Sequence, residues 1–500
     1  MSDRAGTGLT RSELLAVALS AVLLLAVARG YHPTYPTGTN FLRACFAGLA
    51  LWAVFRLVRP GRLGRRWRLL LGVPAVLVLT GAIAMMVAMG WIVLQIRLPQ
   101  IALPLLTVQA IAVIGALVWA WRVEGVRRWV GRWLGVAIVV NTLGYMGLAA
   151  WIWAAPSAES CAPVAGPGVT RLTPQSYPDA HSVPFEVLYV PEEKKVVGTF
   201  KMAGNNVIDL WDDPDANRLV VVDVSDPSRP VLGDLPLSGE LLPEHMDYSP
   251  TQREIVLNRV GYGSHSLDFV SLADFPALTL RHRRALDFPP HGVVTFTDHR
   301  SVGVFGVNMQ FEAVEAETGE PQSRRQYPYG GPTVMVAYIS RPRDTDVVYI
   351  STWGQMVTEL NLVTGERRVV RVPFGGGDIL FVPEMKRVYL TDLMFRRLHI
   401  LDSRSMRLDR TISLDFQPRA IAVDYARDLL MIGAWFTGDV HFYRLRTLEP
   451  VGDPVGLGPY LRKVSYDTER SLLYGASSCG LYQLDVATRP GVLGPRERAP

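Results

Sequence analysis

Three short β runs return in the same order along the C-terminal two thirds of the chain, and this repeat constrains the fold more than any other feature. The clearest copy contains the runs Ile379–Val382, Val388–Thr391 and Leu398–Leu401, separated by turn-forming or polar residues. The same order begins again at Ala420–Val423 and at Lys463–Tyr466. Multi-stranded repeats of roughly 40–45 residues are typical of β-propellers. The sequence therefore predicts an all-β domain folded as a propeller.

The number of repeats predicts the number of blades. Seven segments have the pattern expected of an innermost strand: Phe185–Val190, His245–Tyr248, Gly292–Phe296, Val334–Tyr338, Ile379–Val382, Ala420–Val423 and Lys463–Tyr466. Seven turns that follow the third strands, such as LNLVTGE and LDVATRP, recur with the same spacing. We predict a seven-bladed propeller, with six or eight blades as the alternatives.

Several repeats share a more specific pattern. They contain Val348–Thr352 (VYIST), Val388–Asp392 (VYLTD) and Leu473–Ala476 (LYGA), each followed by a turn and a strand such as Leu398–Asp402. At these residues the chain resembles the YVTN-type propeller repeats, which are relatives of the NHL and WD-like families. The resemblance covers roughly residues 184–490 and implies a fold. That fold serves ligand binding, protein scaffolding and a few enzymes, so function has to be argued from a site.

An apolar N-terminal part precedes the repeats. Of the 500 residues, 49% are hydrophobic, and apolar side chains dominate as far as Ala155. We predict a transmembrane helical domain at 1–155, a linker at 156–169 and a β-propeller domain at 170–500. We expect about five spans that form a membrane α-helical bundle, each near or above the ~20 residues that cross a bilayer. The spans are Leu14–Ala28, Phe41–Val58, Leu69–Ile96, Ile101–Trp121 and Trp133–Ala154. The first run also ends like a signal-peptide cleavage site, so its removal is the alternative.

The distribution of arginine predicts the topology of these spans. Arg residues crowd the loops 56–68 and 122–132, whereas the other connections hold only Arg29, Arg43 and Arg97. By the positive-inside rule the two Arg-rich loops are cytoplasmic. The expected location is the plasma (inner) membrane, multi-pass, with the propeller extracytoplasmic (periplasmic). The net charge of +5 is explained by these loops, and no nucleic-acid partner is predicted.

The spans themselves predict anchoring. No acidic residue or His lies near the centre of a span, and the polar residues deep inside are Gln109 and Asn141. Ion-coupled carriers usually place ionisable groups there, whereas amides usually form hydrogen bonds between helices. We therefore expect the helices to contact the lipid bilayer and a protein partner in a membrane complex.

Polar residues occupy the positions that lead into the expected innermost strands, where the loops of a propeller surround its central channel. These positions hold Glu186, Glu244, His245, His291, Thr333, Asp378, Arg419 and Arg462. Such a ring suits a small anionic ligand or, through His245, His291 and Asp378, a metal ion. The alternative is that these groups bind water and cap the strands. We select His245, His291, Asp378, Arg419 and Arg462 as candidate ligand-binding residues and predict no resident metal or cofactor.

The three cysteines suggest one disulfide. Cys45 lies inside an expected span, whereas Cys161 and Cys479 both lie on the predicted oxidising side of the membrane. Propellers usually close by pairing their terminal segments, which would bring the stretch after Cys161 close to the last blade. We predict a disulfide between Cys161 and Cys479, with two free thiols as the alternative.

Large aromatic residues recur in the loops between the second and third strands. They are Trp211, Tyr262, Trp353, Phe395, Trp435 and Phe436. Exposed aromatic clusters typically mark binding surfaces, so we predict that these side chains form a face for a partner or for the membrane. Packing between blades is the alternative for each of them.

No catalytic motif accompanies these features. The sequence lacks HExxH, CxxC, a P-loop, GxSxG and GxGxxG. The leading hypothesis is a membrane-anchored, extracytoplasmic binding or scaffolding module that is a subunit of a membrane or envelope complex. The alternative is a propeller enzyme, a lactonase-like hydrolase or an oxidoreductase, that uses the polar channel ring as its site.

Overall fold

The computed structural model describes most of the chain after the expected linker. The described residues are 166–174, 182–202, 217–226, 230–237, 241–260, 264–306, 309–327, 336–342, 344–352, 356–372, 377–393 and 395–493. All five expected membrane spans lie outside these ranges. Within these ranges, none of the helices has the length and apolar character needed to cross a bilayer.

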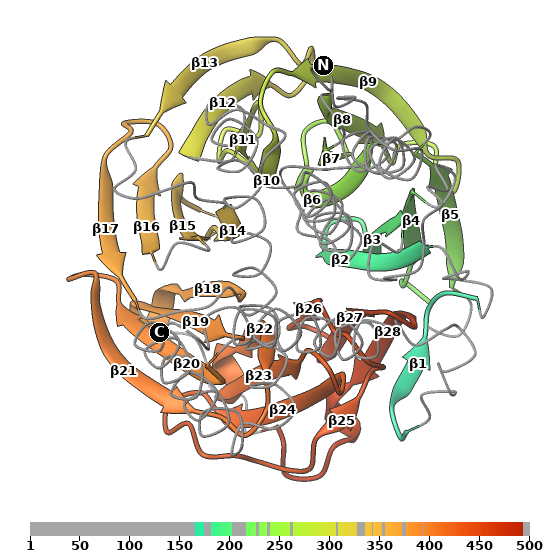
Figure 1. Ribbon diagram of the computed structural model, residues 1–500. Coiled ribbons are helices and arrows are strands. Elements are labelled where there is room, and N and C mark those ends of the chain that lie inside the picture. Colours follow the sequence, from blue (N-terminus) through green and yellow to red (C-terminus); the bar gives the residue numbers. More distant parts are fainter. Residues whose placement is uncertain are drawn as a thin grey trace, which may run out of the picture. The chain divides into compact units, whose positions relative to one another are not determined.

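The described residues form a seven-bladed β-propeller (Figure 1). Each blade is a four-stranded antiparallel sheet whose first strand lies nearest the central axis. The predicted number of blades is confirmed, and the alternatives of six and eight are excluded.

The strands of the first four blades follow one another along the chain. Blade 1 contains β2 (Ser182–Val190), β3 (Lys195–Met202), β4 (Arg218–Asp223) and β5 (Val231–Pro236). Blade 2 contains β6 (Leu242–Ser249), β7 (Glu254–Val260), β8 (His265–Ser271) and β9 (Thr279–Leu286). Blade 3 contains β10 (Pro290–Thr295), β11 (Ser301–Gly306), β12 (Gln310–Glu315) and β13 (Pro321–Gln326). Blade 4 contains β14 (Val336–Ser340), β15 (Val347–Thr352), β16 (Met356–Asn361) and β17 (Arg367–Arg371).

The last three blades include single turns of 3₁₀ helix. Blade 5 contains β18 (Ile379–Val382), η4 (Pro383–Met385), β19 (Arg387–Asp392), β20 (Arg397–Asp402) and β21 (Arg407–Ser413). Blade 6 contains β22 (Pro418–Asp424), η5 (Tyr425–Arg427), β23 (Leu429–Ala434), β24 (Asp439–Arg444) and β25 (Val455–Gly456). Blade 7 contains β26 (Lys463–Asp467), β27 (Leu472–Ser477) and β28 (Gly480–Asp485), followed by η6 (Val486–Thr488), and its outer strand is β1 (Val169–Arg171).

Composition changes from the inner to the outer strands of a blade. The second strands β23 (LLMIGA) and β27 (LLYGAS) are buried along their whole length, as expected for strands covered on both faces by neighbouring blades. The outer strands β13 (PQSRRQ) and β21 (RLDRTIS) are almost fully exposed. Charged residues on such an edge oppose pairing with another sheet.

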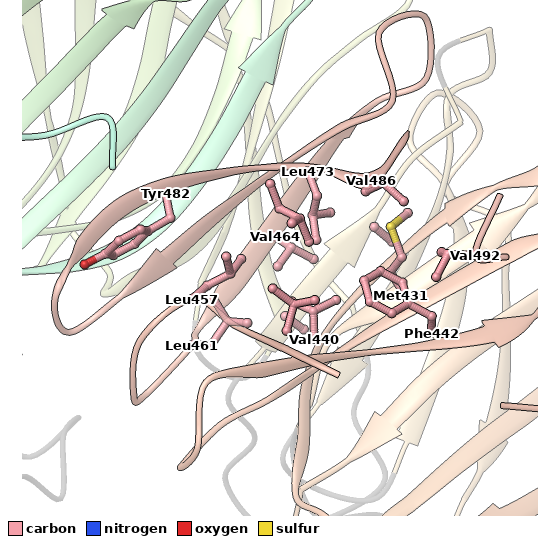
Figure 2. Close-up of a cluster of buried hydrophobic side chains, with 14 of the residues drawn as sticks. Met431, Val440, Phe442, Leu457, Leu461, Val464, Leu473, Tyr482, Val486 and Val492 are labelled. Atoms are coloured by element: carbon pink, nitrogen blue, oxygen red, sulfur yellow. The ribbon is translucent and has the colours of Figure 1, made fainter. Parts of the chain in front are cut away.

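The hydrophobic core is divided among the interfaces between blades. The described residues form seven clusters, and each joins two consecutive blades. Figure 2 shows the cluster between blades 6 and 7, where Met431, Val440 and Phe442 lie against Val464 and Leu473. Because no blade buries its apolar faces alone, the blades stabilise one another through these contacts.

Hydrogen bonds also join the innermost strands of neighbouring blades. At five interfaces a side chain of one blade, at or next to its innermost strand, accepts a hydrogen bond from a backbone N–H in the next innermost strand. The acceptors and donors are Glu186 and Met246, Asp247 and Thr295, Ser340 and Phe381, Asp378 and Ile421, and Ser465 and Tyr189. The last pair connects blade 7 to blade 1. The same type of hydrogen bond therefore joins consecutive blades and joins the last blade to the first.

The two ends of the propeller meet in blade 7. Strand β1 pairs antiparallel with β28, with Val169 opposite Leu484 and Arg171 opposite Tyr482. The expected pairing of the terminal segments is therefore present. Residues that directly follow the apolar N-terminal part and its predicted linker therefore belong to blade 7, the last blade along the chain.

Candidate functional site

Charged and aromatic side chains converge at the end of the channel where the innermost strands begin. We call this group the mouth cluster; it consists of Phe185, Glu186, Lys201, Glu244, His245, His291, Tyr338, Asp378, Arg419, Trp435, Arg462 and Lys463. All seven blades contribute to it. The five residues predicted to bind a ligand belong to this network of contacts. Thr333, which was also predicted to face the channel, lies outside the described residues.

Two carboxylates of the mouth cluster bind histidines. Glu186 accepts a hydrogen bond from the Met246 N–H at 3.0 Å, and its Oε2 lies 3.4 Å from His245 Nδ1. Glu244 lies between Lys201, whose Nζ is 3.3 Å from Oε1, and His291, whose Nε2 is 3.6 Å from Oε2. The Glu244 side chain is fully buried. Each carboxylate therefore fixes a ring or an ammonium that would otherwise be free to rotate.

The third carboxylate, Asp378, holds the opposite side of the cluster. Its Oδ1 accepts a hydrogen bond from Lys463 Nζ at 2.6 Å, and its Oδ2 accepts one from the Ile421 N–H at 3.3 Å. The residue before it must be glycine, because a Cβ on Gly377 would collide with the backbone carbonyl of Thr391. The close approach of these two backbone segments places Asp378 at the start of β18.

Aromatic rings hold the four cations of the cluster. Lys201 Nζ lies 3.7 Å from the ring centroid of Phe185, and Arg462 Cζ lies 5.2 Å from the same centroid. Lys463 Nζ and Arg419 Cζ lie 4.9 Å and 5.0 Å from the ring centroid of Tyr338. Its hydroxyl also accepts a hydrogen bond from Arg419 Nη2 at 2.7 Å. Contacts of this kind orient a cation without neutralising it.

Burial changes the protonation of two members of the cluster. Burial, with His245 and Lys201 nearby, lowers the pKa of His291 to about 4 although Glu244 opposes the change. His291 is therefore neutral at neutral pH. Burial also lowers the pKa of Lys201 to about 8, and the positive charges of Arg462 and Arg419 act in the same direction against Glu244.

The two histidines lie side by side, with ring centroids 4.8 Å apart. His245 is also edge-on to Tyr338 at 5.4 Å. Its Nδ1 faces the Glu186 carboxylate, and its buried Nε2 has no hydrogen-bond partner among the described residues. The described part of the chain contains no group of three or more His, Cys, Asp or Glu side chains placed to bind a metal ion. The arrangement is suited to ligand binding or to proton transfer at His245 Nε2.

A cavity of 740 Å³ leads to the mouth cluster from the other end of the channel. Its wall is mixed, with apolar side chains such as Leu188 and Val293 beside charged ones such as Asp247 and Arg341. Glu186 and Lys463 line the cavity and also belong to the mouth cluster. A volume of this size falls in the range of about 300–1,000 Å³ that is typical of small-molecule sites.

The predicted aromatic residues do not behave as one set. Trp211, Tyr262 and Trp353 lie outside the described residues. Trp435 and Phe436 pack on each other, with centroids 4.7 Å apart, and on Tyr460. Trp435 also lies 5.6 Å from the Arg419 guanidinium, which joins it to the mouth cluster. Phe395 is 42% exposed beside Arg397, so it alone among the described three projects substantially into solvent.

Four members of the mouth cluster escaped the sequence prediction: Phe185, Lys201, Tyr338 and Lys463. The scarcity of lysine could have identified two of them, because the chain has only five Lys residues and two of these lie in the mouth cluster. Phe185 and Tyr338 carry no such signal, since aromatic residues are ordinary components of strands.

Cys479 is fully buried and disulfide-bonded. Cys161 lies outside the described residues, so the pairing of these two cysteines stays a prediction.

Comparison with known proteins adds no family: the chain matches no family model and no curated protein.

Proposed function

We propose that this protein is a membrane-anchored, extracytoplasmic binding module of the YVTN-like propeller type that works as a subunit of a membrane or envelope complex. The observation that carries the proposal is the convergence of side chains from all seven blades on one end of the channel. Contacts between neighbouring innermost strands account for Glu186 and Asp378, which accept hydrogen bonds from backbone N–H groups. They leave the four cations and the two histidines of the mouth cluster to be explained.

The sequence supports the membrane part of the proposal. Five apolar segments precede the propeller, and their Arg-rich loops alternate with Arg-poor ones. A reporter fused after Pro500 should behave as exported, with alkaline phosphatase active there. Activity of a cytoplasmic reporter at the same position, with no phosphatase activity, would refute the topology.

The partner is tested by co-purification of the full chain in mild detergent. We expect a protein to remain bound to the wild-type chain and to be lost when Trp353 and Trp435 are both replaced by Ser. The far-UV circular dichroism of the variant should stay that of the wild type. A variant that unfolds would show that these residues serve packing, and a wild-type chain that purifies alone would contradict membership of a complex.

A second candidate function is hydrolysis, and His245 is the observation that favours it. A histidine with one ring nitrogen facing a carboxylate and the other without a partner resembles a general base. Lactone hydrolysis by the full chain that disappears in His245→Gln would support this candidate. The absence of turnover across a panel of lactones and esters would exclude it.

A further inference from the structure

We infer that the mouth cluster binds a small hydroxylated oxyanion, with Arg419 and Trp435 contacting the anionic group and His245 accepting a hydrogen bond from a ligand hydroxyl. The inference rests on the proposed binding role of this end of the channel and adds the chemical class of the ligand. A hydroxylated carboxylate and a hydroxylated phosphate ester share the required chemistry.

The first support is the charge balance of the cluster. Lys201 and Arg462 contact the ring of Phe185, and Arg419 and Lys463 contact the ring of Tyr338. Lys201 and Lys463 are also paired with Glu244 and Asp378, and the four cations of the cluster outnumber its three carboxylates, which favours an anionic ligand. Groups that carry only N–H donors bind acceptors, and oxyanions are the strongest of these.

The second support comes from two buried nitrogen atoms without hydrogen-bond partners among the described residues. They are Trp435 Nε1, which is a donor, and His245 Nε2. A buried donor or acceptor without a partner destabilises a protein, so such atoms usually have a ligand or water. The Trp435 ring lies beside the Arg419 guanidinium at 5.6 Å. An oxyanion at this position would meet a charged donor and a neutral one.

The third support is the orientation of the His245 ring. Its Nδ1 lies 3.4 Å from the Glu186 carboxylate, which favours a hydrogen on Nδ1 and leaves Nε2 as an acceptor. His245 and Arg419 both contact Tyr338, with distances of 5.4 Å and 5.0 Å to its ring. Both binding positions therefore lie next to the same aromatic ring, so one small molecule is expected to reach both.

The ligand has a route to the cluster. The 740 Å³ cavity ends at Glu186 and Lys463, and both contact members of the cluster. Charged side chains such as Asp247 and Arg341 line this channel beside apolar ones, so it would admit a hydroxylated molecule.

The experiment is isothermal titration of the full chain in detergent at constant ionic strength. The probes are gluconate, glycerol 3-phosphate and, as a carboxylate without hydroxyls, hexanoate. We expect gluconate or glycerol 3-phosphate to bind and hexanoate to bind at least 5-fold more weakly than gluconate, since one neutral hydrogen bond is worth about 1 kcal/mol. Binding of gluconate alone or glycerol 3-phosphate alone would identify the source of the oxyanion.

Variants assign the contacts. Arg419→Gln should weaken binding by about 10-fold or more, and Trp435→Phe, which keeps the ring and removes the N–H, by about 5-fold. His245→Phe should remove the preference for hydroxylated probes. Arg371→Gln, on the exposed strand β17, is the matched control and should change nothing.

Two results would overturn the inference. One is the absence of heat with both hydroxylated probes at millimolar concentration. The other is binding that Arg419→Gln and Trp435→Phe leave intact while both variants keep the thermal midpoint of the wild type. A wild-type chain that purifies alone but still binds gluconate or glycerol 3-phosphate would refute the proposed complex and not the ligand site.

Discussion

Replacing Asp268 by Asn should destabilise the propeller strongly, because this carboxylate is the counter-charge of a fully buried arginine. Arg259 Nη1 lies 3.2 Å from Asp268 Oδ2, and neither side chain is exposed. Asp268 also accepts hydrogen bonds from Arg283 Nε and Nη2, both at 2.8 Å. Burial lowers the pKa of Arg259, yet a guanidinium stays charged at any ordinary pH. The substitution therefore leaves a buried positive charge without its carboxylate.

The size of the effect follows from this burial. Removing one partner of a buried ion pair costs about 3–5 kcal/mol. Arg283 adds little to the loss, since its side chain is 37% exposed and can turn toward water. Arg259 Nη2 also donates to the carbonyls of Leu237 and Leu241, so these backbone contacts keep the guanidinium in place and prevent it from escaping to solvent. We expect the free energy of unfolding to fall by about 3–5 kcal/mol.

The assay is urea unfolding of the full chain in detergent, followed by the β-sheet signal in far-UV circular dichroism. The midpoint should shift with an unchanged slope, which indicates a change in stability and not in the unfolded ensemble. The matched control is Asp287→Asn, because Asp287 binds Arg324 with two hydrogen bonds of 2.8 Å but is 67% exposed. The control should unfold with the wild type. Equal midpoints for Asp268→Asn and the control would refute the argument from burial.

Three further predictions concern other parts of the propeller. Phe311→Ala should lower the free energy of unfolding by about 3–5 kcal/mol, because this ring is buried between blades 3 and 4 and its centroid lies 4.8 Å from that of Phe305. A loss below about 1 kcal/mol in urea unfolding would contradict this packing. The pKa of His291 is lowered from its ordinary value of 6.5 to about 4 in the folded protein, so stability should be lost as the pH falls from about 6.5 to 4, where only the unfolded chain takes up the proton. His291→Gln should flatten this part of the stability profile. Peptide mapping without reduction should recover Cys161 linked to Cys479, whereas alkylation of both in the native protein would exclude the bond.

Much of the propeller could be predicted because its period and its buried strands leave a direct trace in the sequence. Strand ends were harder to place. The run Val334–Tyr338 was expected as the fourth innermost strand, whereas β14 spans Val336–Ser340. The apolar residues continue from Val334 to Ile339 without a polar break, so the hydrophobic pattern does not mark where the strand begins or ends.

The candidate site could be predicted only in part. Residues that lead into innermost strands must lie near the axis of any propeller, and this rule is enough to find His245, His291 and Arg419. Lys201 comes from near the end of β3, whose eight residues bring it back to the same end of the channel, and strand length is not visible in a local pattern. The sequence also suggested a channel set and an aromatic set as separate features, whereas Arg419 and Trp435 join them.

The pairing of β1 with β28 sets an order of events during synthesis. Strand β1 is made first, at Val169–Arg171, but its partner is complete only at Asp485. The earliest strand of the propeller must therefore wait, unpaired, while more than 300 residues follow it. A chain that stops before Gly480 would carry six sheets with their own strands and an open seventh. Such an intermediate exposes strand edges and apolar surface, which makes it prone to aggregation and a substrate for chaperones until the last hairpin arrives.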